Sequence, residues 1–230
     1  MSQKTQMKSI VILLSVASLG TTALVLMYVL KRVNVADIST PASVAGGASN
    51  EIFERGIELP PFTLTGRNGE RVSSESLRGH VWIADFIFTR CVATCPMLTS
   101  RMAQLQKQML DHPQRSQIRL VSFSVDPEHD TPRRLRDFAD RYKADADQWL
   151  FLTGSREAIW SLCDKGFLLG VSKNHKNPAN PIVHSNNFVL IDQQGRIRGY
   201  YDALDEQAQL KLRRDIDRLL AGGTWADAVP

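Results

Sequence analysis

The segment Val81–Phe88 constrains the fold most, because it is nearly continuous in apolar side chains and is only eight residues long. A run of this kind is typical of a strand buried on both faces, at the centre of a sheet that carries helices on either side. A stripe of apolar residues with helical spacing follows it, formed by Leu98, Met102, Leu105 and Met109. The sequence therefore predicts a central strand followed by a helix that packs on the sheet.

Strands and helices alternate along the rest of the chain. The further predicted strands are Ile118–Val125, Asn187–Ile191 and Arg196–Tyr201. Helices are predicted to begin at Asp130-Thr131-Pro132, at Ser155 and at about Asp205. A β-hairpin around the turn Gly66–Gly69 precedes them all. This order predicts one α/β domain with a mixed central sheet flanked by helices, in which the closing strands are antiparallel.

The N-terminal region has a different composition. Ile10–Leu30 is a run of 21 residues without a charged side chain, and a helix of that length spans about 30 Å, the hydrocarbon thickness of a bilayer. We expect residues 1–32 to form a membrane anchor with a single transmembrane helix over about 10–30, residues 33–56 to form a flexible tether, and residues 57–230 to form the folded domain. A cleaved signal peptide is the alternative, although its apolar core is shorter, about 7–15 residues.

The net charge of +4 comes from the N-terminal region alone. Four of the 28 basic residues lie in residues 1–32, which contain no acidic residue, so the remainder carries 24 Lys and Arg against 24 Asp and Glu. A neutral domain lacks the basic surface that binds nucleic acid. Three cysteines are also too few for a fold built on disulfides.

Cys91 and Cys95 lie between the buried strand and the following helix, with Pro96 directly after the second cysteine. If this turn is already helical, positions i and i+4 bring both sulfur atoms to one face. The N-terminus of a helix favours the thiolate, so we expect a lowered thiol pKa. Thiolates attack disulfides and bind soft metals, and the pair is therefore a candidate redox or metal site. Two inert core cysteines, or a structural disulfide, are the alternatives.

Two other polar residues could complete such a site. His184 lies in the loop before the strand that starts at Asn187, and functional groups of α/β sheets gather in the loops at one edge. An imidazole beside two thiolates would suit copper, although a lone histidine is also common in loops and cores. Asp85 interrupts the apolar strand six residues before Cys91. Burial should raise its pKa and make it a candidate proton acceptor for a thiol, unless it simply bonds to the backbone.

The remaining polar and sulfur-bearing residues have structural interpretations. Cys163 lies on the apolar face of a predicted helix and is expected in the core. Asp126 and Asp130 each precede a proline-containing turn, and we interpret them as residues of loop geometry and helix capping.

Three motifs occur in a specific order: Thr89-x-Cys91-x-x-x-Cys95-Pro96, then Ser124-Val125-Asp126-Pro127 with Asp130-Thr131-Pro132, then Val183-His184-Ser185. In this combination, from about Pro60 to the C-terminus, the chain resembles the Sco (SenC) family of membrane-anchored copper chaperones. The resemblance implies a thioredoxin-like fold and one copper ion, Cu(I) or Cu(II), bound by Cys91, Cys95 and His184. It also implies two kinds of partner, the copper-accepting subunit of a cytochrome c oxidase and thiol-redox proteins.

The resemblance also implies a location and leaves two functions open. Without an Arg-rich transit peptide, the chain is expected in the bacterial inner membrane as a single-pass protein whose domain faces the periplasm. The chain departs from the usual family pattern between the cysteines and before the histidine, and its Asp85 is placed as in thioredoxins. We therefore expect a copper metallochaperone or, alternatively, a tethered thiol–disulfide oxidoreductase in which Cys91 attacks, Cys95 resolves and Asp85 moves protons.

Overall fold

The computed structural model describes residues 56–92, 94–174 and 181–222. The chain divides into two units, Met1–Ala48 and Ser49–Pro230. The predicted membrane anchor and the tether up to residue 55 lie outside the described residues. Within the described ranges, none of the helices has both the length and the apolar character needed to cross a bilayer.

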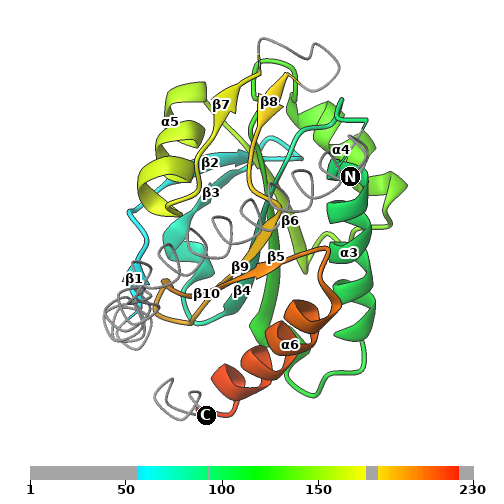
Figure 1. Cartoon of the computed structure of the whole chain (residues 1–230), viewed down its shortest axis with the longest axis vertical. Helices are drawn as coiled ribbons and strands as arrows, with labels where there is room; N and C mark the ends of the chain where they lie inside the picture. The colour runs from blue at the N-terminus through cyan, green and yellow to red at the C-terminus, as the bar shows by residue number, and fades with distance from the viewer. Residues whose placement is uncertain (1–55, 93, 175–180, 223–230) are drawn as a thin grey trace, which may run out of the picture. The chain divides into compact units, whose positions relative to one another are not determined.

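Eight strands form one mixed sheet in the order β1-β10-β9-β4-β5-β6-β2-β3 (Figure 1). Their bounds are β1 Ile57–Glu58, β2 Thr63–Gly66, β3 Arg71–Ser73, β4 Val81–Ile87, β5 Ile118–Ser124, β6 Trp149–Thr153, β9 Asn187–Ile191 and β10 Arg196–Asp202. The strands β4, β5 and β6 are parallel, whereas β9 runs antiparallel to both β4 and β10. Both the parallel centre and the antiparallel finish are as predicted, and β2 and β3 form the predicted N-terminal hairpin.

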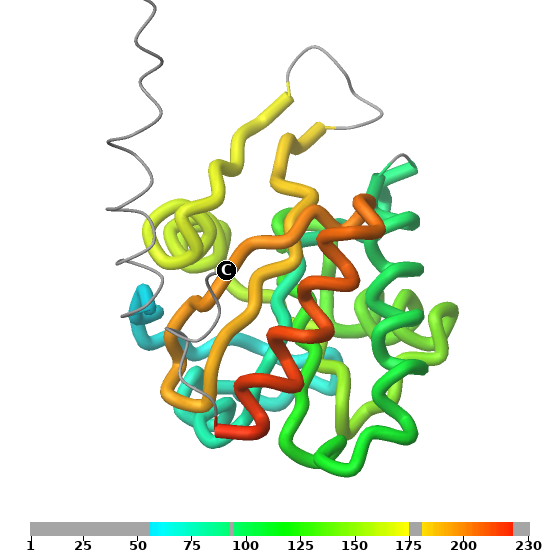
Figure 2. Tube along the Cα trace, turned by 60° about the horizontal axis from the view of Figure 1, so that its bottom comes forward, coloured from blue at the N-terminus to red at the C-terminus, as the bar shows by residue number. Residues whose placement is uncertain are grey.

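In the part of the chain that the structure describes, four α-helices accompany this sheet. They are α3 Thr94–Gln108, α4 Pro132–Arg141, α5 Arg156–Ser161 and α6 Glu206–Leu220. A π-helical turn over Leu162–Gly166 continues α5, and short 3-10 turns cover Ser74–Leu77 and Arg115–Gln117. Figure 2 shows α3 and α6 side by side along the sheet.

The predicted helix starts are correct because capping is a local interaction. The hydroxyl of Thr131 accepts a hydrogen bond from the backbone of Arg134 at the start of α4, where Pro132 is the first helical residue. Ser155 caps α5 and Asp205 caps α6 in the same way. The cap of α4 is therefore Thr131, and Asp130 is free for another role.

The central strand β4 is buried along its whole length. Its parallel register with β5 places Asp85 opposite Ser122, and its antiparallel register with β9 places Ala84 opposite Val189. Ring contacts at 5.0–5.5 Å join Phe86, Phe123 and Phe167 into one aromatic cluster beside the strand. Packing on both faces makes β4 a rigid base for the turn that follows it.

Two short strands, β7 (Ser172–Lys173) and β8 (Ile182–Val183), form a separate antiparallel pair. This pair projects beyond the end of the main sheet (Figures 1 and 2). Strands of two residues are too short to produce a periodic pattern, and the sequence did not predict them. Their position matters because β8 leads directly into the loop that carries His184.

Candidate metal centre

The two cysteines lie in different secondary structure, one in a turn and one in a helix. Cys91 lies in the turn after β4, where its backbone N–H donates to the carbonyl of Phe88 at 3.2 Å. Cys95 is the second residue of α3, which begins at Thr94. The proposed i, i+4 geometry on one helical face is therefore wrong, because the helix starts after the first cysteine. The turn itself brings the two residues together.

The two cysteines are nevertheless near each other in space. Each is a free thiol, and Cys91 is close enough to Cys95 to raise the pKa of the Cys95 thiol. The exposed fraction is 7% for Cys91 and 0% for Cys95. Access from solvent to the pair is therefore greater at Cys91.

His184 reaches the same place from the far end of the chain. Its Nε2 atom lies 3.3 Å from the sulfur of Cys95, and its Nδ1 atom lies 3.0 Å from the carbonyl oxygen of Ser185. A carbonyl oxygen only accepts hydrogen bonds, so Nδ1 carries the hydrogen and the lone pair of Nε2 faces the sulfur. The ring of Phe88 packs edge-on against the imidazole at 5.7 Å. The imidazole is thus oriented before any ion is bound.

Burial dominates the electrostatics of this contact. Desolvation raises the pKa of the Cys95 thiol far above its usual range, and the neighbouring Cys91 and Asp85 raise it further. Burial likewise lowers the pKa of His184. The expectation of a lowered thiol pKa at Cys95 is therefore wrong, because desolvation outweighs the helix N-terminus. The Cys95 thiol and the His184 imidazole are therefore both neutral, and the Cys95 S–H donates to Nε2 of His184.

Asp85 fulfils the expectation of a raised pKa. It is fully buried, and desolvation raises its pKa from 3.8 to about 7. The Ser122 hydroxyl donates to its Oδ1 atom at 2.5 Å, and Ser122 in turn accepts from the indole N–H of Trp149 at 2.9 Å. The Oδ2 atom is buried and has no hydrogen-bond partner among the described residues. One carboxyl oxygen is therefore left for a proton.

The other residues singled out by sequence lie elsewhere or have new roles. Cys163 is buried in the core, where desolvation raises its pKa to about 12. Asp130 does not cap α4 but accepts hydrogen bonds from the turn before Cys91, from the end of β5 and from His129. Sequence reasoning missed this function, because the contacts with Thr89 join segments about 40 residues apart.

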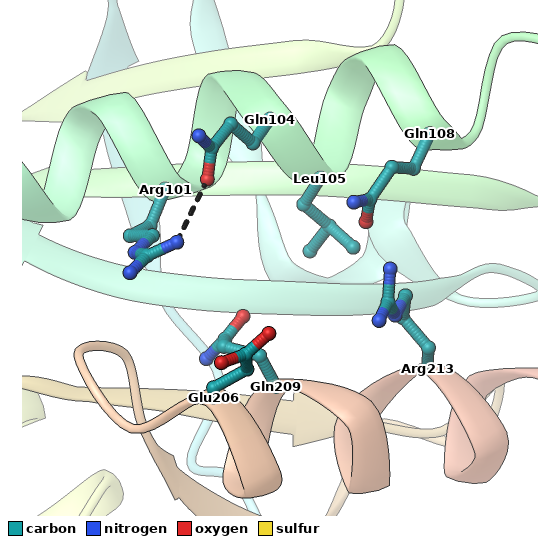
Figure 3. Close-up of a pocket in the computed structure, with 7 residues that line it drawn as sticks. All are labelled: Arg101, Gln104, Leu105, Gln108, Glu206, Gln209 and Arg213. Atoms are coloured by element: carbon teal, nitrogen blue, oxygen red, sulfur yellow. Dashed lines mark hydrogen bonds between the residues drawn. The ribbon is translucent and has the colours of Figure 1, made fainter.

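Of the three predicted ligands, Cys95 and His184 are in contact, and Cys91 lies near Cys95. In the described ranges, no group of three or more His, Cys, Asp or Glu side chains already encloses a position for a metal ion. Binding of one ion by all three would therefore require a rearrangement of the site. The cavity between α3 and α6 is lined by polar side chains around Leu105 and contains none of these ligands (Figure 3).

Comparison with known proteins shows the family of this chain. The SCO1/SenC family model matches residues 53–221. A SCO1 protein homolog from Bacillus subtilis is 39% identical over 149 residues, which are 64% of this chain and 75% of the relative.

Solved structures agree with this match. BsSco, described as a member of the Sco family of cytochrome c oxidase assembly proteins with a disulfide switch, is 35% identical with a TM-score of 0.62, over 71% of this chain and 94% of that chain. ScoI of Bradyrhizobium japonicum, solved with copper bound, is 24% identical with a TM-score of 0.58, over 68% and 98%. This second likeness concerns the fold. Together they show that the predicted thioredoxin-like α/β fold is correct.

Proposed function

Because this chain belongs to the SCO1/SenC family, we propose that it is a copper metallochaperone that helps to assemble the copper centre of a cytochrome c oxidase. BsSco is described as a cytochrome c oxidase assembly protein, and ScoI was solved with copper. The observation that carries the proposal is the 3.3 Å contact between the Cys95 sulfur and Nε2 of His184, with Cys91 close enough to raise the pKa of the same cysteine.

The donor set fits copper as cargo. Two sulfur ligands favour Cu(I), and an imidazole nitrogen also suits Cu(II). We propose Cys91, Cys95 and His184 as the ligands. Binding would displace the thiol protons, including the proton that Cys95 shares with His184. Because Cys91 is the more exposed thiol and lies outside the helix, it is the ligand that an accepting protein would reach first.

The proposal includes a partner and a location. The copper-accepting subunit of the oxidase would receive the ion, and thiol-redox proteins would keep the two cysteines reduced. The uncharged run Ile10–Leu30 would anchor the chain in the bacterial inner membrane, with residues 33–56 as a tether and the domain in the periplasm. A transmembrane anchor would keep the domain close to the membrane and so near a membrane-bound oxidase.

A second function is supported by Asp85. The thiolate of Cys91 would attack a disulfide of the client and release one client thiolate, and Cys95 would then attack the Cys91 sulfur and release the second. The products are a reduced client and a Cys91–Cys95 disulfide, so two electrons pass to the client. Asp85, whose pKa is raised to about 7, would accept the proton of Cys95. A thiol reductant would have to restore the pair.

One set of titrations tests the first function and separates it from the second. The full-length chain in detergent is titrated with Cu(I) and with Cu(II), as wild type and as Cys91→Ser, Cys95→Ser and His184→Ala. Cys163→Ser serves as the matched control, since Cys163 is a buried thiol of the core. We expect one copper ion per chain in wild type and control, and weakened binding in the three others. Equal binding in all five proteins would contradict the copper site.

Reduction of a model disulfide by the reduced, copper-free chain tests the second function. Turnover that is lost in Asp85→Asn would support it. A metal-free protein that reduces no disulfide would exclude it and leave the copper titration unaffected.

A further inference from the structure

Asp130 collects more hydrogen bonds than a loop residue needs. Its side chain is 0% exposed. Thr89 donates to it twice, through its backbone N–H at 3.0 Å and its hydroxyl at 2.5 Å. The hydroxyl of Ser124 donates at 2.6 Å, and Nδ1 of His129 lies 3.0 Å away. A carboxylate has about four acceptor positions, so these contacts satisfy it completely.

The donors come from the segments that surround Cys91. Thr89 lies two residues before Cys91, and Ser124 is the last residue of β5. Asp130 therefore ties the cysteine turn to the carboxyl end of the neighbouring strand. Arg90 makes a second tie from the same turn, since its Nε atom donates to Asp126 at 2.6 Å. Both residues before the cysteine are thus held by carboxylates of the loop that follows β5.

Cys91 depends on this support more than Cys95 does. Cys95 is part of α3, where its carbonyl accepts from the Thr99 hydroxyl at 2.9 Å. Cys91 lies before the helix, and its own backbone bond reaches only back to Phe88. Because the turn carries no regular structure, its position relative to Cys95 is set by what its residues bind to. The two hydrogen bonds from Thr89 attach the turn to Asp130, which is completely buried.

We propose that Asp130, acting through Thr89, is a positioning residue that fixes the Cys91 sulfur relative to Cys95 and His184. It thereby sets both the affinity of the site for copper and the reduction potential of the cysteine pair. The copper part rests on the proposed function, whereas the reduction potential does not. Geometric preorganisation of this kind determines how tightly a ligand set binds and how readily two thiols form a disulfide.

The chain offers a matched control, Asp192, near the end of β4 that is opposite to the cysteine turn. Asp192 is also a buried carboxylate, and it accepts from Arg198 at 2.7 and 2.8 Å and from the backbone of Gln194. Because β9 is antiparallel to β4 and Ile191 pairs with Trp82, Asp192 lies at the start of β4. The cysteine turn lies at its end. Asp192→Asn should cost stability without touching the site.

The experiment compares Asp130→Asn, Thr89→Val, Thr89→Ser and Asp192→Asn in the full-length chain in detergent. The reduction potential of the cysteine pair is measured in glutathione redox buffers, the Cu(I) affinity by competition with a chromophoric chelator, and the folded fraction by thermal unfolding. We expect Asp130→Asn and Thr89→Val to change the redox equilibrium constant and the copper affinity about tenfold, which for this two-electron couple is about 30 mV. Thr89→Ser keeps the hydroxyl and should retain both wild-type values.

The control and the rescue variant decide the interpretation. Asp192→Asn should lower the unfolding temperature and leave potential and affinity unchanged. The proposal is overturned if Thr89→Val leaves the reduction potential unchanged, or if Asp192→Asn shifts it equally. Because Thr89→Val retains the size and the backbone N–H of the residue, it remains informative even if Asp130→Asn does not fold. A wild-type chain that binds no copper would refute the proposed function, whereas the potentials would still test Asp130.

Discussion

The sulfur of Cys95 lies 3.3 Å from Nε2 of His184, although 89 positions of sequence separate the two residues. The sheet explains this contact. Since β9 is antiparallel to β4, the loop that enters β9 lies at the edge where β4 ends and the cysteine turn begins. The short pair of β7 and β8 delivers the chain to that loop. The imidazole is therefore placed by strand register.

Replacement of His184 by Ala should separate copper binding from thiol chemistry. The imidazole supplies the nitrogen ligand, while the two sulfur atoms remain, so we expect copper affinity to fall more than about tenfold. The reduction potential of the cysteine pair should change little. Competition titration and redox buffers measure the two quantities. His112→Ala, at a partly buried histidine that pairs with Asp217, is the control and should bind copper like wild type. Undiminished affinity in His184→Ala would contradict the site.

The two thiols should react with iodoacetamide at very different rates. Cys95 is completely buried, and desolvation keeps its thiol protonated at neutral pH, whereas Cys91 is partly accessible in the turn. We expect Cys95→Ser to be alkylated at Cys91 much faster than Cys91→Ser is alkylated at Cys95. Mass spectrometry of timed samples measures both rates, with denatured protein as the reference. Faster modification at Cys95 would show that the turn opens in solution.

Asp85 should make stability depend on pH. Its pKa is raised from 3.8 to about 7, so the folded chain holds a proton that the unfolded chain has lost between these values. Its contribution to the free energy of unfolding is therefore greatest below about pH 4 and falls as the pH rises to about 7, by up to roughly 4 kcal/mol. Asp85→Asn should remove this slope and be more stable than wild type at pH 8. Urea unfolding across that range measures it.

Ser122→Ala is the informative companion variant. The Ser122 hydroxyl lowers the pKa of Asp85 by donating to its ionised form. Without that donor the pKa should rise further, and the pH-dependent loss of stability should extend to higher pH. Identical slopes in wild type and Asp85→Asn would show that this carboxyl does not titrate as proposed.

Phe88→Leu should leave the imidazole of His184 less firmly oriented. The ring of Phe88 packs edge-on against His184 at 5.7 Å, and such contacts contribute about 0.5–1.5 kcal/mol beyond burial. We expect a loss of about 1–2 kcal/mol of stability and a severalfold loss of copper affinity. Phe151→Leu, at a fully buried ring of β6, should cost similar stability without affecting copper. Equal effects of both variants on copper affinity would exclude an orienting role for Phe88.

Local patterns predicted most of the fold. The strand β4 was evident from its continuous apolar run, and α3 from the stripe that begins at Leu98, because burial on two faces or on one face leaves a direct trace in the sequence. Helix starts at Thr131, Ser155 and Asp205 were evident because a cap binds a backbone group only two or three residues away. The strands β1, β7 and β8 were missed because two residues form no pattern.

The sequence by itself determined the order of strands and helices, and the identity of the two sulfur atoms and the imidazole that could bind a soft metal. Only the tertiary structure decided that His184 meets Cys95, that the Cys95 pKa rises where a helix N-terminus should lower it, and that Asp130 holds the turn before Cys91. The physical reason is common to all three. Desolvation and long-range hydrogen bonds depend on which distant segments pack together, whereas periodicity and capping depend on neighbours along the chain.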